Sequence, residues 1–182
     1  MGIKNRIDAE HAYFLTLTVV DWIDVFTRPV YKHLMIDSLQ HCIDKKGLQI
    51  NAWVLMSNHI HLVASASAVN TTMSDILRDM KKYTSKKIVA AITEVPESRR
   101  EWMLYRFDFA GKYEPKIKNY KFWQDGNDAK EIQTFPFLQQ KIEYIHNNPV
   151  RTELVVEPHH YRYSSAIDYS GGKGLLPVVL AW

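Results

Sequence analysis

Two apolar segments separated by only two residues limit the folds that this chain can adopt. Residues 49–56, QINAWVLM, and residues 59–66, HIHLVASA, are both rich in the β-branched, aromatic and aliphatic side chains that favour strands. Ser57-Asn58 between them is a short turn signal, and so short a connection joins only strands that run antiparallel. The sequence therefore predicts a β-hairpin with a tight loop over residues 49–66.

Other strands and helices are predicted on both sides of this hairpin. The segment HAYFLTLTVV, residues 11–20, is rich in β-branched and aromatic residues and indicates a strand. Pro29 suits the first turn of a helix that continues to about Lys46, where Gly47 can terminate it. The remaining predicted elements are a helix from Met73 to about Thr93, a helical stretch near residues 99–109, a strand at residues 119–124, a helix from Pro136 to about Asn148 and a short helical turn near residues 164–169.

The order of these elements predicts the fold class. Strand, helix, strand, strand, helix, strand and a further helix is close to a split βαβ arrangement. It predicts an α+β fold, a ferredoxin-like antiparallel sheet with helices on one face, whose other face is free to carry a site. Pro149 sets the expected end of the last long helix, because a proline disfavours helical geometry in the residue before it. The 182 residues show no convincing linker, so a single domain over residues 1–182 is expected.

The composition argues against a membrane protein and against a disulfide framework. No run approaches the roughly 18 apolar residues that a spanning helix needs, and the start MGIKNRIDAEH lacks the apolar segment of a secretory signal. The single cysteine, Cys42, cannot form an internal disulfide and fits a reducing compartment. We expect a cytoplasmic protein with no membrane partner.

The sharpest local feature is His59-Ile60-His61 at the start of the second hairpin strand. Side chains alternate along a strand, so His59 and His61 face one side, roughly 7 Å apart, while Ile60 faces the core. Two imidazoles at this spacing can share one divalent cation if their rings converge. The alternative interpretation is a pair of partly exposed strand histidines without a ligand.

A second candidate feature is Tyr144 in the last long helix. Leu138, Ile142 and Ile145 form the apolar stripe of that helix. Tyr144 falls roughly 120° from the middle of the stripe and is not expected in the core. Asn148 lies four positions further on and therefore shares the face of Tyr144. A tyrosine and an amide on one helix face are also common on an ordinary surface, so that alternative stays open.

Phosphoryl transfer could use both features together. A phosphodiester repels nucleophiles, so its cleavage needs charge neutralisation and in-line positioning. A cation held by His59 and His61 could polarise the phosphate, and the side-chain oxygen of Asn148 could be a third ligand. Tyr144 could attack phosphorus and form a covalent intermediate. These ligands carry no negative charge, so the metal keeps its full attraction for phosphate, and Mg²⁺ or Mn²⁺ is expected. A structural zinc site would want four protein ligands and cysteines.

Basic residues interleaved with aromatic residues predict contacts with single-stranded DNA. Positive charge follows phosphates, and flat rings can stack on unpaired bases. The basic candidates lie in two stretches and in the tyrosine helix: Arg78, Lys81, Lys82, Lys86, Lys112, Lys116, Lys118, Lys121, Lys141 and Arg151. The alternative is that these stretches are solvated faces without a ligand.

Two motifs resemble those of a known superfamily. NAWVLMSNHIHLV, residues 51–63, is similar to the metal-binding hairpin of the HUH endonucleases. KIEYIHNNPVR, residues 141–151, is similar to the tyrosine helix of their single-tyrosine, IS200-like transposases. The order and separation of the motifs match most closely those of REP-associated tyrosine transposases, over about residues 10–170. Ser57 stands where relatives usually have proline, and Glu153 stands where a small residue, often glycine, is common.

The resemblance implies a ferredoxin-like fold that carries an HUH metal site. It implies His59 and His61 as metal ligands, Tyr144 as the nucleophile and Asn148 as the third ligand. Members of the family bind hairpins formed by palindromic single strands and cleave beside them. They keep a 5′-phosphotyrosine and a free 3′-hydroxyl, which permits rejoining during DNA transposition.

Three functions stay open at this point. The leading expectation is a metal-dependent single-stranded DNA endonuclease and strand transferase of the transposase type. A domesticated protein that binds hairpin DNA without cleaving it, or a metal-dependent hydrolase that uses water, are the alternatives. The assembly is expected to be a monomer or a homodimer in which a helix serves the site of the partner. His146, beside Tyr144, is expected at the surface or in a capping role.

Overall fold

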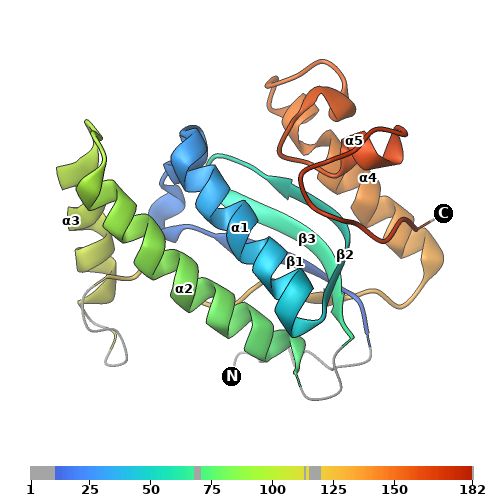
Figure 1. Cartoon of the computed structure of the whole chain (residues 1–182), viewed down its shortest axis with the longest axis horizontal. Coiled ribbons are helices and arrows are strands. Elements are labelled where there is room, and N and C mark those ends of the chain that lie inside the picture. Colours follow the sequence, from blue (N-terminus) through green and yellow to red (C-terminus); the bar gives the residue numbers. More distant parts are fainter. Residues whose placement is uncertain (1–10, 68–70, 113, 115–119, 182) are drawn as a thin grey trace.

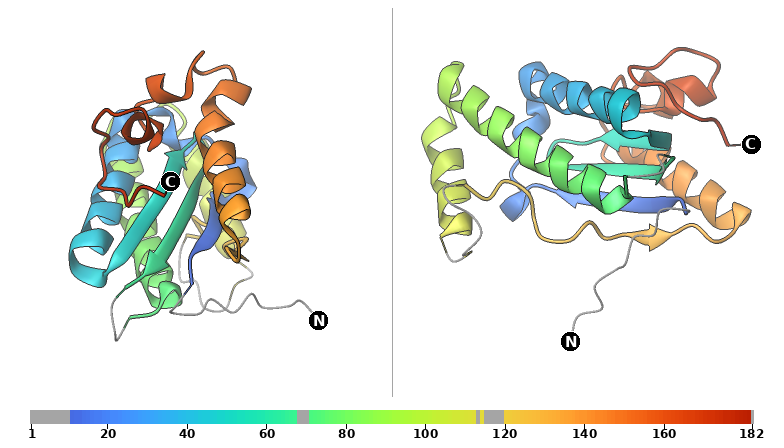
Figure 2. Two further views of the ribbon diagram at one scale, coloured as in Figure 1. Left: turned by 90° about the vertical axis from the view of Figure 1, so that its right-hand side faces the viewer. Right: turned by 60° about the horizontal axis from the view of Figure 1, so that its bottom comes forward.

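A four-stranded antiparallel sheet with helices on both faces forms the frame of the protein (Figure 1 and Figure 2). The computed structural model describes residues 11–67, 71–112, 114 and 120–181. The strands lie in the order β2-β3-β1-β4. Their bounds are Tyr13–Thr18 for β1, Leu48–Leu55 for β2, His59–Ala66 for β3 and Lys130–Glu131 for β4.

The predicted hairpin is confirmed as β2 and β3. Leu55 lies opposite Ile60 at the closed end of the hairpin, and the Met56 N–H donates to the His59 carbonyl oxygen over 2.8 Å. The strand expected over residues 11–20 is confirmed as β1, which pairs with the other side of β3. β3 is therefore an interior strand with a neighbour on each side, which fixes the direction of every side chain along it.

Two long helices, α1 and α2, cover one face of the sheet (Figure 2). α1 spans Pro29–Lys46 and ends at Gly47, whose φ of 71° is the left-handed conformation that glycine adopts readily. α2 spans Met73–Glu94 and begins with a capping box between Thr72 and Asp75. Both helices agree with the ranges expected from the sequence.

Alternation along the strands gives the sheet two apolar faces. Leu15, Ile60 and Leu62 belong to the larger core under α1 and α2. Phe14 and Val63 belong to a smaller apolar cluster on the opposite face. Both faces of the sheet therefore need a cover that excludes water.

α4, Phe135–Arg151, covers this second face, where it packs on β2 and β3 (Figure 2). Ile142 and Ile145 of α4 are buried in the smaller cluster together with Val54. The expectation that helices lie on one face only is therefore wrong. The order of elements did not predict where the last helix packs. Without α4, the apolar side chains on the second face of the hairpin would be exposed to water, and the apolar stripe of α4 is buried against them.

The fourth strand does not lie at residues 119–124. Residue 119 is outside the described residues, and within 120–124 only Trp123 pairs, through an isolated bridge with Val19. Phe122 and Trp123 are both buried in the larger core, and two adjacent inward side chains cannot follow the alternation of a regular strand. The edge strand β4 forms further along the chain, where Lys130 lies opposite Phe14 of β1.

α4 also continues past the expected end at Asn148 and reaches Arg151, with Pro149 inside the helix. A proline lacks one N–H, so it removes a single hydrogen bond, and near a helix end this loss is small. The last carbonyl groups of α4 are satisfied by a Schellman motif, in which the Glu153 N–H donates to Val150 over 3.0 Å and the Leu154 N–H donates to Pro149 over 2.9 Å. The prediction of the helix end from Pro149 is therefore wrong.

The C-terminal segment runs along the outer edge of β2. The Leu55 N–H donates to the Tyr163 carbonyl over 2.9 Å, and the Val179 N–H donates to the Ile50 carbonyl over 2.8 Å. Between these contacts lies the short helix α5, Ala166–Tyr169, close to the helical turn expected near residues 164–169. These contacts cover backbone groups of an edge strand that would otherwise be open to another chain.

α3, Arg100–Gly111, forms where a helical stretch near residues 99–109 was expected. It packs against α2 and against the 3₁₀ turn Val20–Trp22. Two further 3₁₀ turns are Val25–Thr27, which leads into α1, and Pro158–His160, which follows α4. None of the helices in the described residues is long and apolar enough to cross a membrane.

Glu153 has a φ of 58°, in the left-handed region that a non-glycine residue occupies at a cost. We expect Glu153→Gly to raise the free energy of unfolding by about 1 kcal/mol, because glycine adopts this conformation without steric strain. Glu143→Gly, in the middle of α4, should lower the free energy of unfolding by about 1 kcal/mol, because glycine destabilises a helix interior. Urea unfolding followed by circular dichroism measures both, and a destabilised Glu153→Gly would contradict the argument.

Candidate metal and tyrosine site

β3 places His59 and His61 on the face of the sheet that α4 covers. Their ring centroids lie 4.6 Å apart, so the two imidazoles converge. Ile60 between them is fully buried in the larger core on the opposite face. The alternation expected from the sequence is therefore present, and the two rings can approach one ligand together.

α4 places Tyr144 beside these histidines in the same chain. The Tyr144 ring lies 5.2 Å from the His61 ring, centroid to centroid, and 5.9 Å from the Phe14 ring. Phe14 also stacks on His61 at 5.4 Å and forms an aromatic wall between β1 and α4. Tyr144 is half-buried, as expected for a residue beside the apolar stripe rather than within it.

The side chain of Asn58 orients His59. The Asn58 amide Nδ2 donates to the Trp22 carbonyl oxygen over 3.1 Å, so its Oδ1 must be the atom that faces the His59 Nδ1 at 2.7 Å. A carbonyl oxygen only accepts, so Nδ1 of His59 carries the proton and Nε2 keeps a lone pair. This tautomer presents Nε2 to a ligand, in the way that hydrogen-bonded histidines do at metal sites.

His61 is held by Thr16, which lies opposite it on β1. Thr16 Oγ1 and His61 Nδ1 are 2.9 Å apart, and within the described residues the buried Nε2 of His61 has no hydrogen-bond partner. An unsatisfied buried nitrogen is unfavourable unless another group meets it. A divalent metal on the two Nε2 atoms would satisfy this nitrogen, so the residues fit such an ion.

Burial keeps both imidazoles neutral. Burial, the neighbouring His59 and the ammonium group of Lys141 together lower the pKa of His61 to about 3, and burial is the largest of the three causes. Burial also lowers the pKa of His59, and Asp24 opposes this shift. Neutral imidazole is the form that binds metal ions, so both rings are ready to bind at neutral pH.

Additional ligands would have to come from other residue types. Within the residues that the structure describes, no three His, Cys, Asp or Glu side chains are grouped so that they could hold a metal ion. This arrangement does not fit a structural zinc site with four protein ligands. Asn148 is buried on α4, one helical turn from Tyr144, and is the amide that the sequence nominated as third ligand.

Two cations flank the Tyr144 ring. Lys141 Nζ lies 5.8 Å from the ring centroid, and Arg151 Cζ lies 5.2 Å from it. A cavity of about 220 Å³ adjoins the ring, and its lining residues are Gln140, Lys141, Glu143, Tyr144, Asn147 and Arg151. The surroundings of the phenol therefore suit an anion such as a phosphate.

Comparison with known proteins shows the family. The sequence profile described as "Transposase IS200 like" matches residues 10–148, which is most of the chain and includes both histidines and Tyr144. The chain belongs to the IS200-like transposase family. Transposases of this family act in DNA transposition. No curated protein sequence matches the chain.

One of two solved structures compared with the chain has the fold of this IS200-like transposase. A REP-associated tyrosine transposase bound to a REP hairpin matches with a TM-score of 0.64 and 18% identity, covering 100% of this chain and 92% of that one. A Deinococcus radiodurans protein assigned as a transposase matches with a TM-score of 0.43 and 16% identity, covering 81% of this chain and 97% of that one. The first match shows that the four-stranded sheet and its helices form a fold found in a tyrosine transposase.

Some of the basic residues expected to contact DNA are already bound within the fold of this transposase, and others are not. Lys81 Nζ donates to three oxygens, those of Gln124 and Gly126 and of the Asn127 side chain, at 2.9 to 3.2 Å. Lys121 forms ion pairs with two acids, and so does Arg78. Lys82, Lys86, Lys112 and Arg151 are exposed, Lys141 is half-buried, and Lys116 and Lys118 lie outside the described residues.

His146 is not a surface or capping residue. It is buried, its Nε2 lies 2.9 Å from Ser165 Oγ, and its ring lies 4.9 Å from that of Tyr169. Its role is to join α4 to the C-terminal segment. His146 lies four positions after Ile142, so the helical period of the apolar stripe could have predicted its burial.

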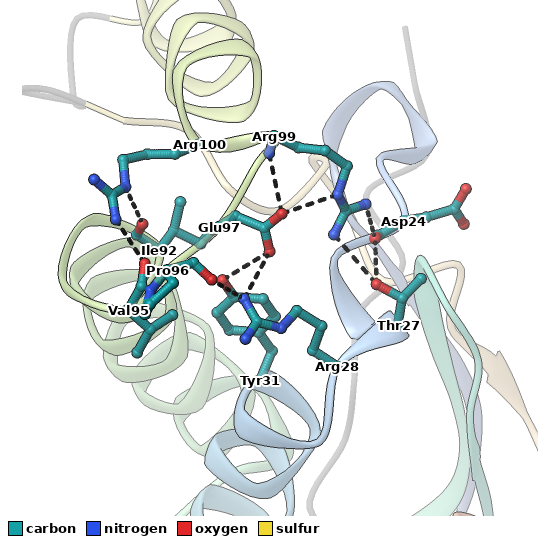
Figure 3. A network of polar contacts seen from close by, with 10 residues as sticks. All are labelled: Asp24, Thr27, Arg28, Tyr31, Ile92, Val95, Pro96, Glu97, Arg99 and Arg100. Atoms are coloured by element: carbon teal, nitrogen blue, oxygen red, sulfur yellow. Dashed lines mark hydrogen bonds and ion pairs between the residues drawn. The ribbon is translucent and has the colours of Figure 1, made fainter.

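The loop of residues 20–28, whose Trp22 carbonyl accepts a hydrogen bond from Asn58, is joined to the residues after α2 by a network of polar contacts (Figure 3). Glu97 Oε2 lies 3.4 Å from Arg28 Nη1 and accepts a hydrogen bond from Tyr31, and its other oxygen lies 3.2 Å from Arg99 Nε. Burial alone would raise the pKa of the Glu97 carboxyl, but hydrogen bonds from Arg99 and Tyr31 bring it to about 2. Arg99 continues to the carbonyl oxygen of Asp24, so the loop before α1 is anchored beside His59.

The neutral state of His61 predicts a pH-dependent stability. With its folded pKa near 3 and an ordinary value of 6.5, the unfolded chain binds more protons, so the folded state loses stability as pH falls from about 6.5 towards 4. We expect His61→Gln to reduce this loss, measured by urea unfolding with EDTA present. His146, whose pKa is lowered to about 4 by burial, should keep part of the slope.

His41→Gln serves as the control, because His41 is an exposed histidine of α1. Its substitution should leave the dependence of unfolding on pH as it is in the unmodified protein. An equal slope in the unmodified protein and in His61→Gln would show that His61 is not held neutral by its surroundings.

Proposed function

We propose that this IS200-like transposase cleaves and rejoins single-stranded DNA with Tyr144 as its nucleophile, beside a divalent metal ion held by His59 and His61. The observation that carries the proposal is the 5.2 Å separation of the Tyr144 and His61 rings within one chain. Two independent sequence motifs, far apart along the chain, supply these residues. Membership of a transposase family supports the same reaction class.

The residues fit the demands of phosphoryl transfer. Bound Mg²⁺ or Mn²⁺ would neutralise charge on the scissile phosphate, with the side-chain oxygen of Asn148 as the proposed third protein ligand. Thr16 and Asn58 hold the imidazole rings in place. Lys141 and Arg151 add positive charge beside the phenol and favour the approach of the phosphate.

The proposed step exchanges one phosphodiester for another. The Tyr144 phenol oxygen forms a bond to phosphorus, the bond from phosphorus to the 3′ oxygen breaks, and a 5′-phosphotyrosine results. The phenol gives up one proton and the departing 3′ oxygen takes up one, so no net proton is consumed. Attack of a 3′-hydroxyl on the phosphotyrosine reverses the step and rejoins DNA without ATP.

We propose hairpins formed by single-stranded palindromic DNA as the substrate. Support comes from the relative of the same fold, whose structure was solved bound to a REP hairpin. Lys82, Lys86, Lys112, Lys141 and Arg151 are the proposed phosphate contacts, because their charges are open to solvent or lie beside the phenol. Lys81, Lys121 and Arg78 are engaged within the fold and are better explained as structural residues.

We further propose that one chain is sufficient for cleavage. Both histidines and Tyr144 meet within a single chain, so no helix from a partner is needed to complete the site. The C-terminal segment also occupies the outer edge of β2, where a second sheet could otherwise add. These two features support a monomer as the active unit, and we propose that residues 1–182 work as a single domain.

We expect unmodified protein with Mn²⁺ to form a covalent adduct with a labelled single-stranded oligonucleotide that carries a palindromic hairpin, seen on a denaturing gel. Tyr144→Phe should abolish the adduct, because the nucleophilic oxygen is absent. Tyr83→Phe, which removes the phenol oxygen of an exposed tyrosine on α2, should leave the adduct unchanged.

The other outcomes separate the alternatives. Release of a free 5′-phosphate that persists in Tyr144→Phe indicates a hydrolase that uses water. Hairpin binding that survives His59→Ala, with no covalent product in any divalent metal, indicates a DNA-binding protein without cleavage activity. Either result would falsify the proposed transesterase.

Asn58 is proposed as a positioning residue for His59. We expect Asn58→Ala to weaken Mn²⁺ binding about tenfold in isothermal titration calorimetry, because the His59 tautomer is no longer fixed. Ser57→Ala in the same turn is the control and should bind Mn²⁺ as the unmodified protein does. An unchanged affinity in Asn58→Ala would count against this role.

A further inference from the structure

Trp22 is the most conspicuous exposed aromatic residue near the site. Its side chain is 66% exposed, although large aromatic rings usually lose most of their contact with water on folding. Its φ of 51° and the φ of 54° at Asp21 place two successive non-glycine residues in the left-handed region. Such a backbone persists only where surrounding contacts impose it, and here it carries an indole that is open to solvent.

The contacts that hold this backbone lead directly to the site. The Trp22 carbonyl oxygen accepts from the Asn58 amide over 3.1 Å, and Asn58 in turn holds His59. The Asp21 carboxylate is fixed by Arg106 of α3 at 2.6 Å. Backbone hydrogen bonds from Val19 to the Asn58 carbonyl and from Phe26 to the Ser57 carbonyl fasten the same loop to the hairpin turn. The backbone of Trp22 is therefore held in place, and only the Asn58 side chain lies between it and a proposed metal ligand.

A cavity of about 250 Å³ opens beside Trp22. Its polar lining comes from Asp21, Lys121, Gln124 and Asp125, so hydrogen-bond donors and acceptors are both present. Lys121 pairs with Asp125 at 2.6 Å and with Glu114 at 2.9 Å, and Asp21 pairs with Arg106 at 2.6 Å, so each acid of the lining lies against a cation. The cavity thus combines one flat apolar ring with polar groups that can both donate and accept hydrogen bonds.

We propose that Trp22 and this cavity bind an unpaired nucleobase of the nucleotides that flank the scissile phosphate. The indole stacks on the face of the base, and the polar groups of the cavity meet its edge. The inference rests on the proposed function, because it takes the DNA strand to pass beside His59. It adds a binding site and a class of ligand that the catalytic residues do not supply.

The chemistry of the site favours a nucleobase over other occupants. An exposed tryptophan is a stacking surface for any base, since every base has a π-face. The polar lining suits the donors and acceptors of a base edge better than an apolar side chain from another protein. Asn58 also joins the backbone of Trp22 to His59 by two hydrogen bonds, which places the loop that carries the indole next to the proposed cleavage centre.

The test combines protein variants with DNA that lacks single bases. Hairpin oligonucleotides with an abasic nucleotide at each position flanking the cleavage point are bound to protein that carries Tyr144→Phe, which prevents reaction. We expect Trp22→Ala to weaken binding of intact DNA about tenfold. One abasic position should weaken binding to the background protein by the same factor and have no further effect in Trp22→Ala.

Further variants separate loss of the ring from loss of the fold. Trp22→Phe keeps a ring and should recover most of the affinity. Trp22→Gly suits the left-handed backbone, retains the carbonyl contact with Asn58 and should match Trp22→Ala. Mn²⁺ binding by calorimetry should be the same in all three variants. Trp102→Ala is the matched control, because Trp102 is an exposed tryptophan of α3 that does not line the cavity.

The inference is overturned if protein with Trp22→Ala and Tyr144→Phe binds intact DNA as tightly as protein with Tyr144→Phe alone. A loss that is the same on intact DNA and on every abasic DNA also overturns it, because no base is then contacted. A dimer that Trp22→Ala converts to monomers, with unchanged DNA affinity, would assign the ring to contact between copies instead. If the unmodified protein forms no adduct, the proposed function fails by that result alone, while the binding measurements still decide the role of Trp22.

Discussion

The exclusion of water from the space between β3 and α4 is the condition on which the chemistry of this protein depends. His61 is only 5% exposed, and burial holds its imidazole neutral far below the pH at which a free histidine would gain a proton. The same burial leaves Nε2 without a partner in the described residues, while Thr16 occupies Nδ1. A low-dielectric environment strengthens the interaction of a cation with phosphate, so the packing that protects the imidazole also favours phosphoryl transfer.

The proposed metal ligands and the proposed nucleophile stand on different elements of the fold. The histidines stand on an interior strand whose neighbours on both sides fix its register. Tyr144 stands on a helix whose position depends on the burial of Ile142 and Ile145 against the sheet. A smaller side chain in place of either isoleucine would leave a cavity and shift the Tyr144 phenol, although neither isoleucine is proposed to contact DNA. A displacement of about 1 Å is enough to slow a reaction of this kind strongly.

Local patterns predicted the parts of the structure that depend on local geometry. Strand alternation placed His59 and His61 on one side, and the helical period placed Tyr144 beside the apolar stripe. The face of the sheet that α4 occupies was predicted wrongly, because it depends on which apolar surface remains uncovered after the rest of the chain has folded. Asn58 and Trp22 escaped notice for a similar reason, since their roles require a left-handed loop and a turn, distant in sequence, to meet.

The seam between the C-terminal segment and β2 also bears on how the protein is made. Trp53 and Ser165 exchange hydrogen bonds across 112 residues of sequence, so this contact forms only after most of the chain has left the ribosome. Until then the nascent hairpin offers an unpaired strand to any neighbour that can add to it. The chain is therefore most open to misassembly after β2 has been synthesised and before residues 163–179 pair with it. A chaperone would raise the yield of folded protein most in this interval.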